Sequence, residues 1–208
     1  TVTGGAVTGN NNAWVKRSFT PITTTKVRVV VNATTDGFSR IVELEAWGGG
    51  SPPAFNVALA SNGSSATADA TLGGSPSHAI NGLRHPNNQG LYWISDTTGA
   101  PGVPRWIEVD FGQPRTISQV VLVGLRDGGD VYNTDPSAVE IAPFGTTTNF
   151  KVQTWSGTAW VDTATVTGNT LLVRPVNFSP VTTSKVRIYI TQTGWSVAYV
   201  VELEAYGY

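Results

Sequence analysis

Short runs of alternating hydrophobic and polar residues recur along this chain. In "RWIEVDFG" (105–112) the apolar Ile107 and Val109 alternate with the acidic Glu108 and Asp110. A period of two is typical of a β-strand with one buried face. Similar runs occupy 118–125, 149–155, 185–190 and 199–206. The turn-forming stretches "FGQP", "RDGGD", "SGTAW" and "FSPVTT" separate them, and no window shows a 3.6-residue apolar stripe. The pattern predicts an all-β fold of two packed sheets, a sandwich or jelly roll, with little helix.

The chain also repeats part of itself. A shift of 159 positions aligns residues 6–48 with 165–207 without a gap, and 18 of the 43 pairs are identical. An offset of this size is the length of a module, so residues 1–48 are interpreted as the C-terminal third of a preceding copy. Residues 49–208 are predicted to form one complete β-sandwich domain.

The Gly, Ser and Pro content of "GGGSPPAF" (48–55) favours a linker at this boundary. An alternative is that both repeated segments belong to one sheet of a single larger domain. A detached third of a sheet has unpaired edges and an uncovered apolar face. We therefore expect residues 1–48 to pack on the complete domain or to exchange strands with another copy of the chain.

Composition narrows the possible partners. The 208 residues have a net charge of −1, only 13% are charged, and there is no run of Lys or Arg that would favour nucleic acid or anionic lipid. No stretch approaches 18 uninterrupted apolar residues, so membrane insertion is not expected. The absence of Cys excludes disulfides and thiolate metal sites. Low charge with abundant Thr and Asn favours an extracellular or cell-surface location.

Four stretches, taken in order, resemble a known family. They are "NVALASNGSSATADATLGGSPSHAINGLR" (56–84), "RWIEVDFGQPRTISQVVL" (105–122), "FKVQTWSGTAWVDTATVTGN" (150–169) and "SKVRIYI" followed by "VVELEAYG" (184–207). Their order resembles the discoidin, or coagulation factor V/VIII type C, superfamily. The resemblance implies an eight-stranded, galactose-binding-like jelly-roll sandwich with its two ends close together. It also implies a carbohydrate-binding role, because many bacterial members are binding modules of secreted proteins.

The resemblance further implies a Ca²⁺ site where "AINGL" meets the closing strand. Hard cations prefer carboxylate and carbonyl oxygens. The matching side chains are Asn81 and Glu202, with carbonyl groups near His78, Leu83 and Val201 as further ligands. Asn81 stands where the family usually has Asp, which removes one negative charge. The alternative is that Glu202 belongs to the polar face of a strand.

A glycan site is implied in the loops at one end of the sandwich. Sugar rings pack on flat aromatic faces, and planar polar groups fix the orientation of their hydroxyl groups. By analogy with the family, the loops are 84–95, 124–135 and 193–198. The candidate ligand-binding residues are Arg126, Asn133, Trp195, His85, Trp93 and Tyr132.

Two of these candidates have a structural explanation that needs no ligand, and a third has additional support from the repeat. Trp93 is equally compatible with a buried plug beneath its loop. Arg126 is compatible with an ordinary salt bridge to Asp127 or Asp130. Trp195 has Asp36 as its counterpart in the first repeat, so the fold does not require the aromatic ring, and a role specific to this copy is favoured.

Catalysis is not expected from this sequence. There are two His residues, and no G-x-S-x-G, H-E-x-x-H, P-loop or G-x-G-x-x-G pattern occurs. Two functions therefore compete. The first is a non-catalytic carbohydrate-binding module or repeat of a larger extracellular protein. The second is a structural or adhesive surface repeat in which copies assemble by exchanging strands through residues 1–48.

Overall fold

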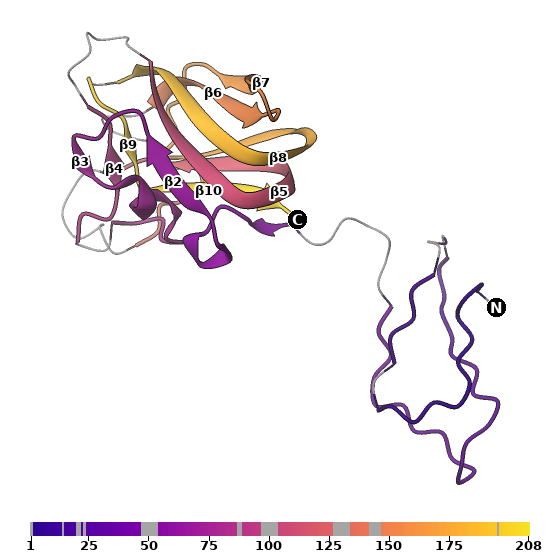
Figure 1. Ribbon diagram of the computed structural model, residues 1–208. Helices are drawn as coiled ribbons and strands as arrows, with labels where there is room; N and C mark the ends of the chain where they lie inside the picture. Colours follow the sequence, from indigo (N-terminus) through magenta and orange to yellow (C-terminus); the bar gives the residue numbers. More distant parts are fainter. Residues whose placement is uncertain are drawn as a thin grey trace. The chain divides into compact units, whose positions relative to one another are not determined.

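The chain folds into two compact units. The structure is a computed structural model that describes residues 2–13, 15–19, 22, 24–46, 54–86, 89–96, 104–126, 134–141, 147–194 and 196–208. The units are Thr1–Ser51 and Pro52–Tyr208, and each is described by itself (Figure 1). The predicted boundary after residue 48 lies outside the described residues.

The second unit is built from antiparallel sheets, which confirms the all-β prediction. Its strands are β1 (Phe55–Asn56), β2 (Ser65–Ala68), β3 (Gly73–Gly74), β4 (Trp93–Ile94), β5 (Arg105–Val123), β6 (Thr147–Trp155), β7 (Trp160–Val166), β8 (Val173–Thr193), β9 (Tyr199–Val200) and β10 (Glu202–Gly207). The helices among the described residues are two short 3-10 turns, η1 (Ala60–Asn62) and η2 (Pro76–Ile80).

Strand β5 organises the larger sheet. The strand order is β1-β10-β5-β8-β6-β7, and β2 adds to β5 beside its first half. One edge of β5 therefore pairs with β2 and then with β10, while its other edge pairs with β8 along nearly its whole length. The smaller sheet has the order β3-β4-β9. The curved β5 and β8 lie side by side in Figure 1.

Two predicted turns are wrong. The stretches "FGQP" (111–114) and "FSPVTT" (178–183) lie inside β5 and β8 instead of ending a strand. Their turn residues produce irregularities in the pairing: the register shifts between Asp110 and Arg115, and Gly112 there has a φ of 71°. A second shift lies between Ile117 and Gln119, where residues 178–180 of β8 are unpaired. Pairing resumes beyond each irregularity, so both strands bend without separating.

The period of two places one face of the sheet in the core. Ile107 and Val109 of β5, with Ile188 of β8 and Val152 of β6, are all fully buried and belong to one hydrophobic cluster. The residues that alternate with them point to the opposite face and are mostly half-buried, and Gln153 of β6 is 8% exposed. Burial of the inner face provides most of the stabilisation.

The first unit differs sharply from its repeat partner. Its described residues form no strands and make local turns, such as the one in which Asp36 accepts the backbone N–H of Phe38. Val29 is 53% exposed, whereas its repeat counterpart Ile188 is 0% exposed. The interpretation of residues 1–48 as part of a preceding repeat stays a prediction.

Candidate functional site

The segment after β5 is anchored by Arg126, one of the predicted ligand-binding residues. Its Nε and Nη2 donate to the two carboxylate oxygens of Glu140. Its Nη1 donates to the hydroxyl of Thr134 at 3.0 Å, and Nη2 reaches the carbonyl oxygen of Asp135 at 3.5 Å. This guanidinium therefore joins the end of β5 to the segment 134–141, and the contact lowers the pKa of Glu140.

A second predicted residue converges on the same segment. His85, which follows η2, places Nε2 4.0 Å from Oδ1 of Asp135. The backbone supports the arrangement, because Leu172 donates to the carbonyl of Glu140 and Gly124 donates to the carbonyl of Leu172. Two loops distant in sequence thus meet at the segment 134–141.

The remaining ligand-binding candidates have different outcomes. Trp93 is 0% exposed, and its Nε1 donates to the hydroxyl of Thr71 at 3.0 Å, so the ring belongs to the core and cannot stack on a sugar. The prediction that Trp93 binds a ligand is therefore wrong. Tyr132, Asn133 and Trp195 lie outside the described residues. Arg126 pairs with Glu140, and Asp127 and Asp130 also lie outside the described residues.

Sequence reasoning missed Thr134 and Glu140 at this site. The sequence places Thr134 next to the candidate Asn133, which was a usable signal. Glu140 is separated from Arg126 by 14 positions in a stretch without periodicity, so only the folded chain brings the two together.

The predicted metal site contains a buried carboxylate. Glu202 begins β10 and is 0% exposed. Its Oε1 accepts the backbone N–H of Gly82 at 3.0 Å, whereas Oε2 is buried and has no hydrogen-bond partner. Burial raises the pKa of Glu202 to about 9. The alternative that Glu202 belongs to the polar face of a strand therefore stays open, but this residue is not exposed to solvent.

The other predicted metal ligands already make hydrogen bonds within the protein. Asn81 is exposed, and its Oδ1 accepts the backbone N–H of Leu83 at 2.7 Å. His78 places Nδ1 3.4 Å from the carbonyl oxygen of Tyr92. Val201 precedes Glu202 and donates its backbone N–H to Val123. In this set, the unpartnered oxygen of Glu202 is the group that fits a cation.

An ion pair lies beside Glu202. Arg84 donates Nε and Nη2 to the two carboxylate oxygens of Glu204, each at 2.7 Å, and this contact raises the pKa of Arg84. Tyr206 donates its hydroxyl to the same carboxylate. Among the described residues there is no cluster of three or more His, Cys, Asp or Glu side chains arranged around a common point. A cation at Glu202 would therefore need backbone and amide oxygens as well.

Comparison with family models identifies the fold family. Residues 61–203 match the model described as F5/8 type C domain. The chain belongs to this family. The match spans most of the second unit, and it confirms the resemblance that the four sequence stretches indicate.

Solved structures show the same fold. The family 32 carbohydrate-binding module of Clostridium perfringens NanJ, solved with galactose, is 22% identical with a TM-score of 0.52, over 74% of this chain and 98% of that one. Chitosan-binding module 1 from a chitosanase/glucanase of Paenibacillus sp. IK-5 is 26% identical with a TM-score of 0.52, over 74% and 99%. Allantoicase of Saccharomyces cerevisiae is 15% identical with a TM-score of 0.56, over 74% and 43%.

These comparisons make the second unit a homologue of carbohydrate-binding modules.

The search of curated protein sequences found no match to this chain. In the part of the chain that the structure describes, no helix has the length and apolarity needed to cross a bilayer.

Proposed function

We propose that the second unit is a non-catalytic carbohydrate-binding module of an extracellular or cell-surface protein. It binds a glycan at the end of the sandwich where Arg126 and His85 converge. The observation that carries this function is the Arg126 network, which holds the segment 134–141 against the end of β5. A pre-ordered loop loses less conformational entropy when a sugar binds. Family membership supports the ligand class.

The role of Arg126 in this proposal is to position the loop. Glu140 and Thr134 already accept hydrogen bonds from its guanidinium, so the ligand contacts come from the neighbouring residues of the loop. His85 and the predicted Tyr132, Asn133 and Trp195 supply the ring and amide groups that sugar recognition needs.

Glycan-array screening followed by calorimetric titration tests the proposal. The probes are galactose, fucose and chitotriose, because relatives of similar fold bind these sugars. Arg126→Ala and Trp195→Ala are each expected to weaken binding by roughly tenfold or more. Arg115→Ala is the matched control, since its guanidinium lies 5.8 Å from the Phe55 ring and makes no contact with the segment 134–141 in the described residues. Equal affinities for all four proteins would disprove the site.

A structural Ca²⁺ ion at Glu202 is part of the proposal. The unpartnered Oε2 of Glu202 would bind it, with the amide oxygen of Asn81 and nearby backbone carbonyl oxygens completing the set. The ion would neutralise a buried carboxylate and fasten the loop after η2 to β10. It has no direct part in sugar recognition.

A second function, assembly of copies in an adhesive surface protein, is favoured by a different observation. In the second unit β5 lies between β8 and β10. The first unit holds the repeat counterparts of β8 and β10 but nothing that matches β5, and its counterpart residues Val27 and Leu44 are both more than half exposed. A β5-like strand from another module would cover them, and self-association of the chain through residues 1–48 is the measurable consequence.

A further inference from the structure

The outer face of the large sheet carries a cluster of aromatic rings around one cation. The guanidinium carbon of Arg187, on β8, lies 4.4 Å from the ring centroid of Trp160, 5.3 Å from that of Tyr189 and 5.8 Å from that of Trp106. Trp155 packs edge-on against Trp160 with centroids 5.4 Å apart. We refer to these five residues as the outer-face cluster.

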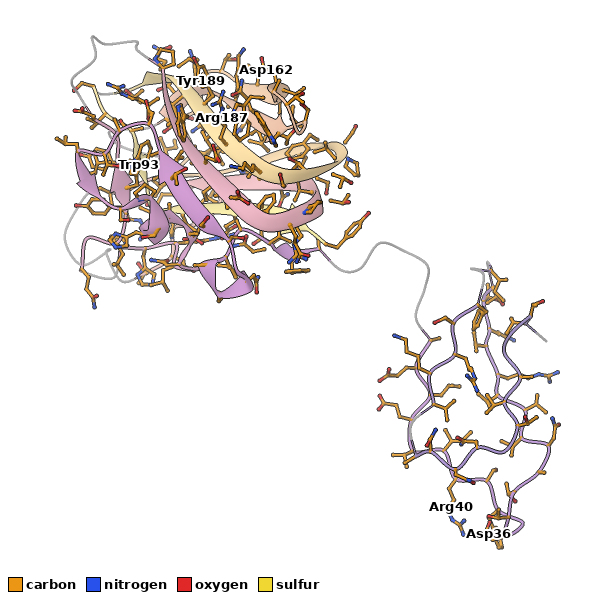
Figure 2. All side chains as sticks on the ribbon, in the orientation of Figure 1. Asp36, Arg40, Trp93, Asp162, Arg187 and Tyr189 are labelled. Carbon is orange, nitrogen blue, oxygen red and sulfur yellow. The ribbon has the colours of Figure 1, made fainter. Side chains whose placement is uncertain are left out.

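Strand pairing explains how five residues from four strands meet. Trp106 of β5 stands opposite Tyr189 of β8, and Trp155 of β6 stands opposite Trp160 of β7. Arg187 lies between them, because it is paired with both β5 and β6. All five side chains point away from the core and are half-buried. Figure 2 shows Arg187 and Tyr189 together on β8, with Asp162 on the neighbouring part of the sheet.

A row of planar polar groups crosses the cluster. Arg187 donates Nε to Oε1 of Gln153 at 2.6 Å, Gln153 donates Nε2 to Oδ1 of Asp162 at 2.5 Å, and Lys151 donates to Oδ2 of Asp162 at 2.6 Å. These contacts fix a guanidinium, an amide and a carboxylate beside the rings. In the described part of the chain, the two Nη groups of Arg187 have no acceptor. Burial lowers the pKa of Arg187, which indicates that the cation is partly desolvated.

The charges of this face balance. Lys185 pairs with Glu108 at 2.9 Å and with Asp110 at 3.2 Å, and Lys151 pairs with Asp162. With Arg187 the face has three cations and three carboxylates, so its net charge is zero. A highly charged polymer would therefore gain little electrostatic attraction from this face. A neutral partner with apolar C–H faces and many hydroxyl groups matches both the rings and the polar row.

We propose that the outer-face cluster is a second saccharide-binding surface, which takes a neutral polysaccharide chain across strands β5, β8, β6 and β7. Pyranose C–H faces pack on Trp106, Trp155 and Trp160, and ring hydroxyls accept hydrogen bonds from the Nη groups of Arg187. The four strands span three interstrand spacings, about 14 Å, which is room for several linked sugars. This surface is separate from the Arg126 site, and the inference goes beyond the function proposed for that site.

A purely structural role is the competing explanation. Aromatic and cation pairs across strands stabilise a sheet without binding anything. That role predicts that changing the cluster lowers the melting temperature and leaves saccharide affinity unaltered. Measuring affinity and melting temperature in the same variants separates the two.

Affinity electrophoresis of the full chain in gels containing a soluble β-galactan, a xylan or a β-glucan is the test. Trp160→Ala and Arg187→Met are expected to weaken binding to at least one of these polysaccharides by about tenfold. Phe55→Ala is the matched control, because Phe55 is an exposed ring beneath a single Arg in the same domain, and its removal is expected to change nothing.

The variant Arg126→Ala distinguishes this inference from the proposed function. If Arg126→Ala loses polysaccharide binding while Trp160→Ala retains it, the outer-face inference is overturned and the Arg126 site is supported. If Trp160→Ala loses binding and Arg126→Ala retains it, the outer-face inference is supported and the Arg126 site is not. If Trp160→Ala instead abolishes dimers seen by sedimentation, a second copy covers this face and the inference is overturned.

A measurement on the unmodified protein tests the inference without variants, which could lose binding because they misfold. Indole N–H resonances of a ¹⁵N-labelled sample are followed while the same polysaccharides are added. Resonances of Trp106, Trp155 and Trp160 are expected to shift together, and that of the buried Trp93 is expected to stay. Saturating amounts of all three polysaccharides without a shift at the cluster would overturn the inference.

Discussion

At the scale of single residues, Glu202 shows how burial controls chemistry. Its carboxylate lies in the interior with one backbone donor at Oε1 and none at Oε2. Ionising such a group without a counter-charge is unfavourable, and for this reason its pKa rises to about 9. A bound cation would lower the pKa of Glu202 again, since it stabilises the ionised carboxylate.

The pH dependence of stability follows from this pKa. In the unfolded chain Glu202 loses its proton near 4.5, whereas in the folded domain it keeps the proton up to about 9. The folded state binds more protons in this window, so stability without metal is expected to fall as the pH rises from 4.5 to about 9. Thermal unfolding in EDTA checks this, and Glu202→Gln is expected to remove the slope. Added Ca²⁺ is expected to raise the melting temperature of the unmodified protein but not that of Glu202→Gln. The increase should be largest at high pH, where the carboxylate ionises most readily.

Glu140→Gln is the matched control for this experiment. Arg126 holds the pKa of Glu140 below its usual value, so its contribution to stability is present above the unfolded pKa and is lost as the pH falls. The effect of Glu140→Gln should therefore shrink in acid and should not depend on Ca²⁺. If Ca²⁺ stabilises Glu202→Gln as strongly as the unmodified protein, the ion binds elsewhere.

At the scale of elements, the turn residues of the long strands explain the main error of the sequence interpretation. Gly and Pro in "FGQP" predict a chain reversal, but this stretch lies between two parts of β5 that both pair with β8. Each strand accommodates its own irregularity as a bend, because pairing with the other strand resumes beyond it. Pairing between distant segments overrides local turn preference here, and a sequence window cannot contain that information.

The small sheet depends on one glycine. Gly74 has a φ of 69°, and a Cβ placed there would lie 1.8 Å from the carbonyl oxygen of Tyr92. Gly74→Ala would therefore push β3 away from β4, the strand that carries the buried Trp93. We expect a loss of about 3 kcal/mol in the free energy of unfolding, measured by urea denaturation.

Gly157→Ala provides the comparison for this loss. Gly157 lies in the turn between β6 and β7 with a φ of 98°, and a Cβ at this position would meet no atom within 4 Å. Its replacement should cost only the conformational penalty, about 1 to 2 kcal/mol. Equal losses in the two variants would show that the close approach at Gly74 is relieved by a small shift.

At the scale of the whole molecule, the two units should behave differently. Residues 52–208 contain a closed hydrophobic core, whereas the described apolar residues of the first unit are largely exposed. We expect residues 52–208 alone to keep the melting temperature of the full chain's main transition, checked by calorimetry. The full chain is expected to self-associate in sedimentation experiments, and residues 52–208 are expected to be monomeric.

Matched surface variants test whether the first unit is responsible for self-association. Val29→Asp lies at the counterpart of a buried core position, and Val161→Asp lies on β7 with similar exposure. Val29→Asp should abolish self-association, because a charge cannot be covered by a partner strand without penalty, while Val161→Asp should not. A full chain that stays monomeric at high concentration would eliminate strand exchange between copies.

The sequence by itself determined the features that depend on neighbouring residues and on order along the chain. Strand periodicity predicted the all-β class, and four ordered motifs predicted the family. Tertiary structure alone decided which of the predicted residues meet. It buried Trp93 and Glu202, joined Arg126 to Glu140 and gathered the rings around Arg187. The physical reason is that a period of two separates the two faces of a strand, whereas neighbours on a face are set by the pairing of strands far apart in the chain.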